Sequence, residues 1–587
     1  MIRIIRRLRK YLGKYTIYVV IAPFCMIADV VLELLMPLMM ASIVDKGIPS
    51  MDLPYILRIG GIMLLLSLGA MAFGCINMVL SSTAAQGFGW NVRQAIFAKV
   101  TSFAFSDIDR FSTASLVTRL TNDVTQLQNT FMMTLRIMIR APFMLTFALI
   151  LAIGIHARLA LVLVVAIPIL GAGIFYVMSR AEKLFAILQK KLDALNGTVQ
   201  ENLIAIRVVK AFVREAHERT KFGKANDELR DSAIKASSLV ITIMPMMTLV
   251  MNLATLAVLW FGGSLVNAGD LTIGRLISFL QYITQILMSL MMVSMVFLMA
   301  ARARASGNRV IEVLETEPAI HDERLVAEGT ESAGEEGVVH GRVEFRDVSF
   351  RYASAGSGED VLSGVSFVAE PGEVVAIVGG TGTGKTSLVN LVPRLYDVSG
   401  GQVLVDGRDV RAYPLRALRR GIGVVLQNNV LFSGTIRDNL LWGDREATQD
   451  TVELAARQAQ AHEFIMAFPD GYDTMLGQGG VNVSGGQKQR LCIARALLRR
   501  PRILILDDST SAVDTDTERR LREAMRAGLR DTTVLLIAQR ISSVSWADRI
   551  VVLDAGRVVG NGTHTVLMET CPVYREICQS QIEGVAA

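Results

Sequence analysis

Six long apolar stretches in the first half of the sequence constrain its fold more than any other feature. A helix needs about 20 mainly apolar residues to cross the hydrocarbon layer of a bilayer. The second stretch carries no charge between Arg58 and Arg93, which argues against a soluble helical core with water-facing stripes. The sequence therefore predicts six transmembrane helices. Their expected ranges are 15–43, 59–85, 141–157, 159–179, 236–269 and 276–301. The third is only marginally long enough to cross by itself, and the amphipathic segment that precedes it from Leu127 can extend it.

Charge in the connecting segments predicts their orientation. The long connections 87–125 and 180–235 are rich in Lys and Arg, whereas the short ones near Asp45, His156 and Asp270 are nearly bare. Basic loops remain in the cytoplasm, so we expect both long loops and both termini there. The long loops also have helical patterns, which predicts that spans two to five continue beyond the bilayer as rods. The basic, amphipathic first 15 residues predict a short helix on the inner membrane surface.

The composition divides the chain into a membrane half and a soluble half. The hydrophobic fraction is 51%, and the apolar residues are concentrated before residue 305. Much of the Lys and Arg behind the net charge of +6 flanks apolar segments, where phospholipid headgroups are the expected partner and nucleic acid is not. The five cysteines show no CxxC spacing, so neither a disulfide framework nor a metal knuckle is indicated.

The domain organisation follows from this division. Residues 1–305 are expected to form a transmembrane domain of six helices, an N-terminal interfacial helix and cytoplasmic loops. Residues 306–340 resemble an acidic linker, with the run EGTESAGEEG. Residues 341–587 alternate strand-like runs such as EVVAIVG and ILILDD with helical ones. That alternation predicts an α/β domain with a largely parallel sheet.

A glycine-rich loop, GGTGTGKT, follows the strand EVVAIV and opens a helical segment. Its glycines let backbone N–H groups converge on phosphates, Lys385 can neutralise the β and γ oxygens, and the Thr386 hydroxyl can ligate Mg²⁺. After the apolar run ILIL, Asp507 is placed to accept the magnesium ion. The sequence therefore predicts a site for ATP and Mg²⁺. The expected phosphate-binding residues are Gly379, Gly380, Thr381, Gly382, Thr383, Gly384, Lys385, Thr386 and Ser387.

Two further segments, VSGGQKQR at 483–490 and SAVD at 511–514, follow this loop in a specific order and spacing. With them the chain resembles the ATP-binding cassette (ABC) exporters over nearly its whole length, in the half-transporter form of six membrane helices and one P-loop ATPase domain. The resemblance implies ATP-driven alternating access, with coupling regions at 106–120 and 202–212. It also implies the following roles: Tyr352 stacks on adenine, Gln427 contacts Mg²⁺, Asp514 lies in the crossing loop, and Ser484, Gly485, Gly486 and Gln487 cap ATP bound by another subunit.

The sequence departs from the family pattern at two groups that handle the attacking water. Asp508 stands where the family has Glu, and Gln539 stands where it has His. Shortening the side chain withdraws the carboxylate by roughly 1 Å, a displacement that can cost about 10²-fold in rate. Gln offers no cationic state. These departures resemble the degenerate-site subunit of heterodimeric exporters and predict a partner chain with intact Glu and His. Gln478, where the family more often has Glu, is a further departure.

The sequence indicates the cargo only faintly. Methionines adapt to varied apolar shapes, so a stripe of them favours amphipathic, drug-like small molecules, with helix packing or a lipid-facing surface as the alternative. The stripe comprises Met288, Met292, Met295 and Met299 beside Gln281 and Gln285, and Met244, Met247 and Met251 on the preceding span. In the first span, Asp29 and Glu33 lie four residues apart on one face. They are expected either to attract cationic cargo or to pair with Arg136 or Arg140.

Two other hypotheses remain open. One is a homodimeric exporter of a lipid, a peptide or a siderophore that hydrolyses ATP slowly. The other is a membrane subunit that nucleotide binding regulates and that pumps nothing. In each case the expected location is a bacterial cytoplasmic membrane, with the ATPase domain in the cytoplasm.

Overall fold

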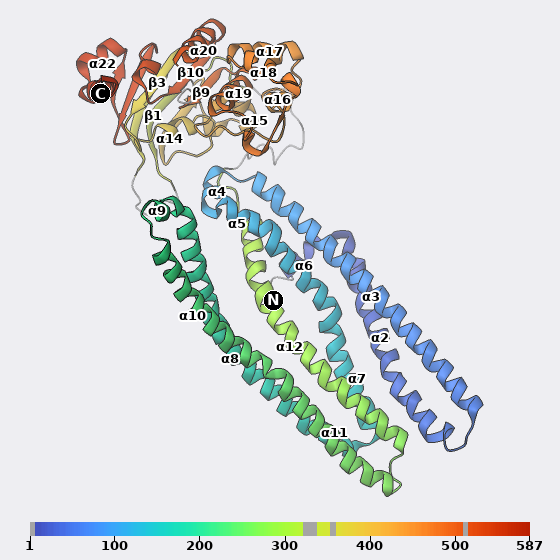
Figure 1. Cartoon of the computed structure of the whole chain (residues 1–587). Helices are drawn as coiled ribbons and strands as arrows, with labels where there is room; N and C mark the ends of the chain where they lie inside the picture. Colours follow the sequence, from blue (N-terminus) through green and yellow to red (C-terminus); the bar gives the residue numbers. More distant parts are fainter. Residues whose placement is uncertain (1–5, 321–336, 353–359, 509–514, 587) are drawn as a thin grey trace. The chain divides into compact units, whose positions relative to one another are not determined.

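The computed structural model describes residues 6–320, 337–352, 360–508 and 515–586. Their backbone falls into two compact units. One, here the helical unit, comprises Met1–Val100 and Ala114–Thr316; the other, here the α/β unit, comprises Thr101–Thr113 and Glu317–Ala587 (Figure 1). Asp514 and residues 321–336 of the expected acidic linker lie outside the described residues.

Six helical segments of the described residues are long and apolar enough to cross a membrane, which confirms the predicted number. The spans lie on α2 (Thr16–Ser42), α3 (Leu53–Thr101), α7 (Ile139–Ile155), α8 (Ala157–Ile204), α11 (Ile243–Asn267) and α12 (Ile273–Glu315). At 1.5 Å per residue the 49 residues of α3 extend for about 70 Å, more than twice the thickness of the hydrocarbon layer. The predicted rods are therefore present.

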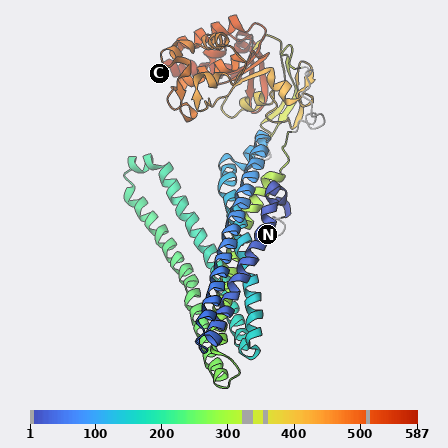
Figure 2. The ribbon, with the colours of Figure 1, turned by 90° about the vertical axis from the view of Figure 1, so that its right-hand side faces the viewer.

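Short elements complete the helical unit. They are η1 (Arg9–Tyr15), η2 (Ile43–Gly47), α5 (Thr113–Thr118), η3 (Arg119–Asp123), α6 (Val124–Met133), η4 (Thr134–Met138), α9 (Ile206–Ala211) and α10 (Glu215–Ile241). Helices α8 and α10 run side by side, and α9 joins their ends (Figure 1). Seen from the side, this α8–α10 hairpin diverges from the other helices of the unit (Figure 2).

The sixth span continues further than the sequence predicted. Helix α12 ends at Glu315, so residues 306–315 of the expected linker are helical. Ser306, Val310 and Val313 are buried, which explains why the helix does not end at residue 305. Arg309 on this stretch donates from Nε to Asp123 of η3 at 2.7 Å, and Arg119 of η3 donates to Glu312 at 2.8 Å. These ion pairs attach the end of the sixth span to the third.

Asp29 and Glu33 of the first span form ion pairs with an arginine of the third span. Arg140 on α7 donates from one Nη to Asp29 at 2.5 Å and from the other to Glu33. Arg140 rather than Arg136 makes this connection. The structural pairing that the sequence left open is thus the one observed, and it satisfies two carboxylates in an apolar environment, where an unpaired charge is costly.

The α/β unit is built on a largely parallel sheet, as predicted. In its described part, six strands run in the order β12-β11-β3-β10-β9-β6, with β12 antiparallel and the others parallel. Their bounds are β3 (Val374–Gly379), β6 (Ile422–Val425), β9 (Ile503–Asp507), β10 (Thr533–Ile537), β11 (Arg549–Asp554) and β12 (Arg557–Gly562). An antiparallel sheet with the order β2-β1-β4-β5 comprises Leu362–Ala369, Val343–Phe350, Gly400–Val405 and Arg408–Asp409.

The central strands are apolar on both faces because the sheet is covered on both. Leu504 and Leu506 of β9 belong to one hydrophobic cluster, whereas Ile503 and Ile505 of the same strand belong to another. The helices that the site uses are α14 (Lys385–Asn390), α19 (Gly485–Leu498) and α23 (Pro572–Ala586). Parallel pairing places the carboxyl ends of β3, β10 and β9 in adjacent positions at one edge of the sheet.

The first coupling region divides between the two units. Thr101–Thr113 packs with the α/β unit and contains α4 (Phe105–Phe111), whereas the chain from Ala114 onward packs with the helical unit. The range 106–120 expected for this region therefore spans the boundary between the two units, and its role in coupling stays a prediction. The division arises because Asp107 and Asp109 of α4 contact Ala319 and Tyr396, which lie more than two hundred residues further along the chain.

We predict that Arg140→Met destabilises the helical unit, because it leaves two carboxylates without their cation. Losing one partner of a buried pair is costly; since a third of the Glu33 side chain is exposed, we expect a loss of about 2 kcal/mol. Thermal unfolding of the full-length chain in detergent, followed by tryptophan fluorescence, measures this. Arg58→Met, at an exposed position on α3, is the matched control. Adding Asp29→Asn and Glu33→Gln to Arg140→Met should restore stability; an Arg140→Met protein that melts like the wild type would contradict the prediction.

Candidate nucleotide site

The glycine-rich loop connects β3 to α14 in a conformation that only glycine adopts easily. Gly382 and Gly384 have φ angles of +81° and +90°. A Cβ at Gly379 would lie 2.2 Å from the carbonyl oxygen of Leu553, so a side chain does not fit there. Lys385 folds back over the loop, and its Nζ donates to the carbonyls of Gly379 at 2.9 Å and Gly380 at 2.6 Å. The loop thus holds a cation over its own backbone.

Asp507 ends β9 next to this loop. Its side chain accepts a hydrogen bond from the Thr386 hydroxyl at 3.2 Å, and the residue is only 2% exposed. Burial raises the pKa of the Asp507 carboxyl, and the Thr386 hydroxyl and the Lys385 charge partly offset that rise. Burial likewise lowers the pKa of the Lys385 amine, against the opposing effect of Asp507 and Asp508. The three groups predicted to hold MgATP are therefore brought together.

These residues fit the metal that the sequence predicts. Mg²⁺ binds through one or two carboxylates together with phosphate oxygens and water. The buried Asp507 carboxylate and the adjoining Thr386 hydroxyl supply two oxygen ligands, and Lys385 supplies a charge for phosphate. When bound, Mg²⁺ would neutralise phosphate oxygens beside Thr386 and Asp507.

Asp508 directs its carboxylate to a different set of partners. It lies in the left-handed region with φ +49°, which Asp adopts more readily than most residues, and its N–H donates to Ile537 O at 2.9 Å. Gln539, which follows β10, donates from Nε2 to Asp508 Oδ2 at 2.9 Å, and the Gln427 side chain also bonds this carboxylate. Burial raises the pKa of Asp508 despite these two hydrogen bonds. Two adjacent carboxylates thus have separate partners.

Two glutamines that the sequence did not single out support this arrangement. Gln489 is 1% exposed on α19 and donates to the Asp508 carbonyl at 3.2 Å. Gln581 on α23 donates to the Gln539 carbonyl at 2.6 Å and accepts from Ile541 N at 2.8 Å. Gln489 lies inside the segment VSGGQKQR, which was the only sequence signal for it. For Gln581 there was none.

The residues predicted to cap another subunit's ATP, 484–487, here called the signature, form the start of α19. Ser484 is its N-cap: its Oγ accepts from Gln487 N at 3.3 Å, and Gln487 Oε1 accepts from Ser484 N at 2.9 Å. This reciprocal capping box fixes the helix start. Ser484 and Gly485 are exposed. Gln478 begins a short 3₁₀ turn, Gln478–Gly480, shortly before it.

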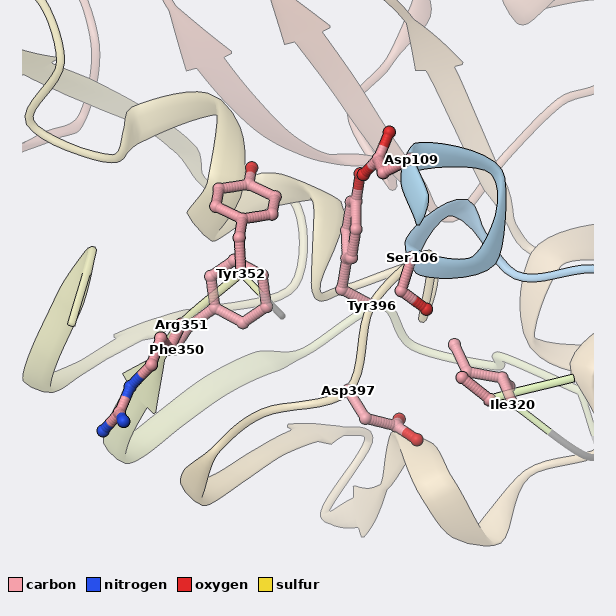
Figure 3. A pocket seen from close by; sticks show the side chains of 9 residues that line it. Ser106, Asp109, Ile320, Phe350, Arg351, Tyr352, Tyr396 and Asp397 are labelled. Atoms are coloured by element: carbon pink, nitrogen blue, oxygen red, sulfur yellow. The ribbon is translucent and has the colours of Figure 1, made fainter. Parts of the chain in front are cut away.

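Tyr352, the residue predicted to stack on adenine, lies against α14, the helix that follows the glycine-rich loop. The Tyr352 hydroxyl hydrogen-bonds Ser387 Oγ at 2.8 Å, which accounts for the buried Ser387 next to Thr386. Its ring meets Phe350 at 4.8 Å and Tyr396 at 5.3 Å between centroids, both edge to face (Figure 3). Adenine stacking on Tyr352 stays a prediction.

Comparison with known proteins identifies the family. The family described as "ABC transporter transmembrane region" matches residues 19–290, and that described as "ABC transporter" matches residues 362–511. An uncharacterized ABC transporter ATP-binding protein of Bacillus subtilis, YfiB, is 42% identical over 571 residues, covering 97% of each chain. This chain belongs to the ABC transporter family.

Other ABC proteins are similar over most of this transporter. A putative multidrug export ATP-binding/permease protein of Bacillus subtilis, YgaD, is 34% identical and covers 83% of each chain. An ATP-dependent lipid A-core flippase of Syntrophus aciditrophicus is 33% identical over 87% of this chain and 83% of its own. The solved structure of a bacterial Atm1-family ABC exporter with ATP bound matches with a TM-score of 0.78 and 25% identity, covering 98% of each chain.

These findings confirm the architecture that the sequence predicted. The ABC transporter has the exporter layout of six membrane-crossing helices followed by an ATPase domain of the P-loop type. It is a multi-pass membrane protein with a cytoplasmic ATPase domain, here the α/β unit, and it is expected to act as an ATPase-coupled translocase. An ATP-binding domain of this family implies ATP as its nucleotide.

We predict that Lys385→Ala weakens ATP binding to the full-length chain by about tenfold or more, because charge-assisted hydrogen bonds to phosphate are lost. A titration with a fluorescent ATP analogue in lipid nanodiscs measures the dissociation constant. Arg557→Ala removes an exposed cation of the same unit and should leave the affinity unchanged. Equal affinities for Lys385→Ala and wild type would show that the loop does not hold the phosphates.

Proposed function

We propose that this chain is one subunit of a heterodimeric, ATP-driven exporter of amphipathic small molecules, and that its own site holds MgATP and hydrolyses it slowly. The observation that carries the proposal is the hydrogen bond from Gln539 to Asp508 at 2.9 Å. It joins the two positions at which the sequence departs from the family's water-handling pair.

The chemistry of these groups supports slow hydrolysis. The group at position 508 has to orient or deprotonate the water that attacks the γ-phosphate. Here the carboxylate is short, and it accepts hydrogen bonds from the Gln539 and Gln427 side chains. The Gln539 amide can donate hydrogen bonds but cannot become cationic or relay a proton. Lys385, Thr386 and Asp507 are nevertheless present and adjacent, as nucleotide binding requires, which supports a site that binds ATP without cleaving it quickly.

The start of α19 supports a role toward another subunit's ATP. The first N–H groups of a helix have no partner within the helix and are suited to bind phosphate. In α19 the Gln487 N–H is bonded to Ser484 Oγ, and the two glycines that precede it leave their backbone open to approach. An intact signature beside a slow site is useful if it completes a faster site on a partner chain that has Glu and His.

The tip of the α8–α10 hairpin supports a partner as well. Leu203 and Ile204 are 65% and 78% exposed at the end of α8, and Phe212 and Val213 after α9 are 73% and 79% exposed. Apart from Val213, this apolar tip lies within the predicted coupling region 202–212, on the hairpin that diverges from the other helices of its unit (Figure 2). Apolar clusters of this kind mark interaction sites. In the proposed heterodimer, the ATPase domain of the partner chain would bind this apolar tip.

The cargo class rests on the similar proteins and on the fifth and sixth spans. The names of two relatives refer to multidrug export and to lipid A-core flipping, and both kinds of cargo are amphipathic. Met288 and Met292 are 42% and 37% exposed on α12, and Gln285 beside them has a buried Oε1 without a partner among the described residues. Met247, by contrast, is packed in the helix core, as the alternative had it. The side chains of Met295 and Met299 lie outside the described residues.

We predict that Asp508→Glu combined with Gln539→His raises ATP turnover at this chain's own site by about tenfold or more, because it restores the length and the proton carrier that water activation needs. Single-turnover phosphate release, with the variant co-assembled with its partner chain, measures the gain. The control Asp554→Glu makes the same chemical change at an exposed strand end. No gain with a partner whose signature is intact would argue against a deficit at these two positions.

We predict that Ser484→Arg abolishes hydrolysis at the partner's site, because a bulky cation replaces the cap that faces its γ-phosphate. Steady-state ATPase activity of the assembled complex measures the loss. Thr448→Arg is the matched control, since Thr448 also caps a helix of the α/β unit, α17 (Gln449–Gln458). Unchanged turnover in the Ser484→Arg complex would count against a composite site.

A further inference from the structure

The inner face of the C-terminal helix α23 ends on a glutamine. Tyr574, Cys578 and Gln581 are spaced four and three residues apart, so they lie on the same side of the helix. Tyr574 and Cys578 are 0% and 4% exposed, and they belong to the hydrophobic cluster that also contains Leu504 and Leu506 of β9. This face of α23 therefore packs into the core beneath the candidate nucleotide site.

A second contact fixes α23 at Tyr574. The Tyr574 hydroxyl hydrogen-bonds His564 Nδ1 at 2.8 Å, and the two rings meet edge to face with 5.7 Å between centroids. His564 opens α22 (His564–Thr570), the helix that precedes α23. Because Tyr574 is held both by the core and by α22, Gln581 extends from an anchored helix.

Gln581 uses both ends of its side-chain amide on a single stretch of backbone. Its Nε2 donates to the Gln539 carbonyl at 2.6 Å, and its Oε1 accepts from Ile541 N at 2.8 Å. These two backbone groups belong to the residues on either side of Arg540. One side chain thus acts as donor and as acceptor, as a peptide group of a neighbouring strand would, and it fixes residues 539–541 at two points.

The bond from Ile541 also completes the start of a helix. Ile541 is the first residue of α21 (Ile541–Val544), and the first N–H groups of a helix have no partner within that helix. Arg540, the N-cap residue, makes no side-chain hydrogen bond to them. Gln581 therefore supplies, from another helix, the cap that the local sequence lacks.

This arrangement fixes the backbone from which the Gln539 side chain extends. The Gln539 amide donates to Asp508 Oδ2 at 2.9 Å. Gln489 of α19 holds the backbone of Asp508, because its Nε2 donates to the Asp508 carbonyl at 3.2 Å. Both residues at which the sequence departs from the family's water-handling pair are thus held at their backbone by a glutamine of a different helix.

We propose that Gln581 is a positioning residue: it holds residues 539–541 so that the side chain at position 539 reaches the carboxylate at position 508. The proposal rests on the proposed function, because it takes these two positions as the ones that handle the attacking water. Misplacing such a group by about 1 Å can cost about 10²-fold in rate. The C-terminal helix therefore determines how precisely residue 539 faces residue 508.

The first test uses the Asp508→Glu, Gln539→His chain, co-assembled with its partner chain, and measures single-turnover phosphate release. Adding Gln581→Ala should lower the rate gained over the wild-type complex by about tenfold and leave the half-saturating ATP concentration within about twofold, because the phosphate-binding residues are unchanged. Gln581→Glu should cause a similar loss, because a carboxylate can accept from Ile541 N but cannot donate to the carbonyl of residue 539.

The second test does not depend on hydrolysis. Hydrogen–deuterium exchange of the full-length chain in lipid nanodiscs reports on the peptide that covers 538–545. In an otherwise wild-type chain, Gln581→Ala should speed its exchange by about fivefold, because the Ile541 N–H loses its acceptor. Gln579→Ala is the matched control in both tests, since Gln579 is exposed on the same helix, and it should change neither result.

The proposal is overturned if Gln581→Ala exchanges like the wild type over 538–545. It is also overturned if that variant exchanges faster and yet leaves the gained hydrolysis rate unchanged. Failure of Asp508→Glu with Gln539→His to gain any turnover would instead refute the proposed deficit at these two positions, and the exchange measurement alone would then decide whether Gln581 holds residues 539–541.

Discussion

Parallel pairing of β3, β10 and β9 is the constraint on which the account of the site depends. Neighbouring parallel strands end at the same edge of a sheet. The loop after β3, Asp507 and Asp508 at the end of β9, and Gln539 after β10 are therefore brought together, although the loop lies more than a hundred residues before the other three in the chain. A sheet buried on both faces holds these ends rigidly, so a one-methylene difference at position 508 is not absorbed by movement of the strand.

At this edge of the sheet, two adjacent carboxylates have different hydrogen-bond partners. Asp507 turns toward Thr386 and the phosphate loop, whereas Asp508, with its left-handed backbone, turns toward Gln539 and Gln427. Glutamine amides neutralise none of the carboxylate's charge, yet they occupy its acceptor positions. We therefore propose that this site holds nucleotide and activates water poorly.

The sequence predicted the parts of the structure that depend on local pattern. A membrane-crossing helix can be recognised from a few tens of residues. The same holds for a glycine-rich loop between a strand and a helix. The end of α12 was placed too early because burial of Val310 and Val313 depends on packing against other helices, which charge and composition do not reveal. The roles of Gln489 and Gln581 depend on tertiary contacts across the α/β unit. The attachment of α4 through Asp107 and Asp109 likewise joins segments more than two hundred residues apart.

We propose that this chain binds MgATP and cleaves it slowly without a partner. Measuring ATP binding and phosphate release on the same sample of the purified full-length chain, reconstituted alone in lipid nanodiscs, tests this proposal. We expect saturable, Mg²⁺-dependent binding with phosphate release close to the rate of a protein-free control. Brisk release of phosphate by the chain alone would contradict it.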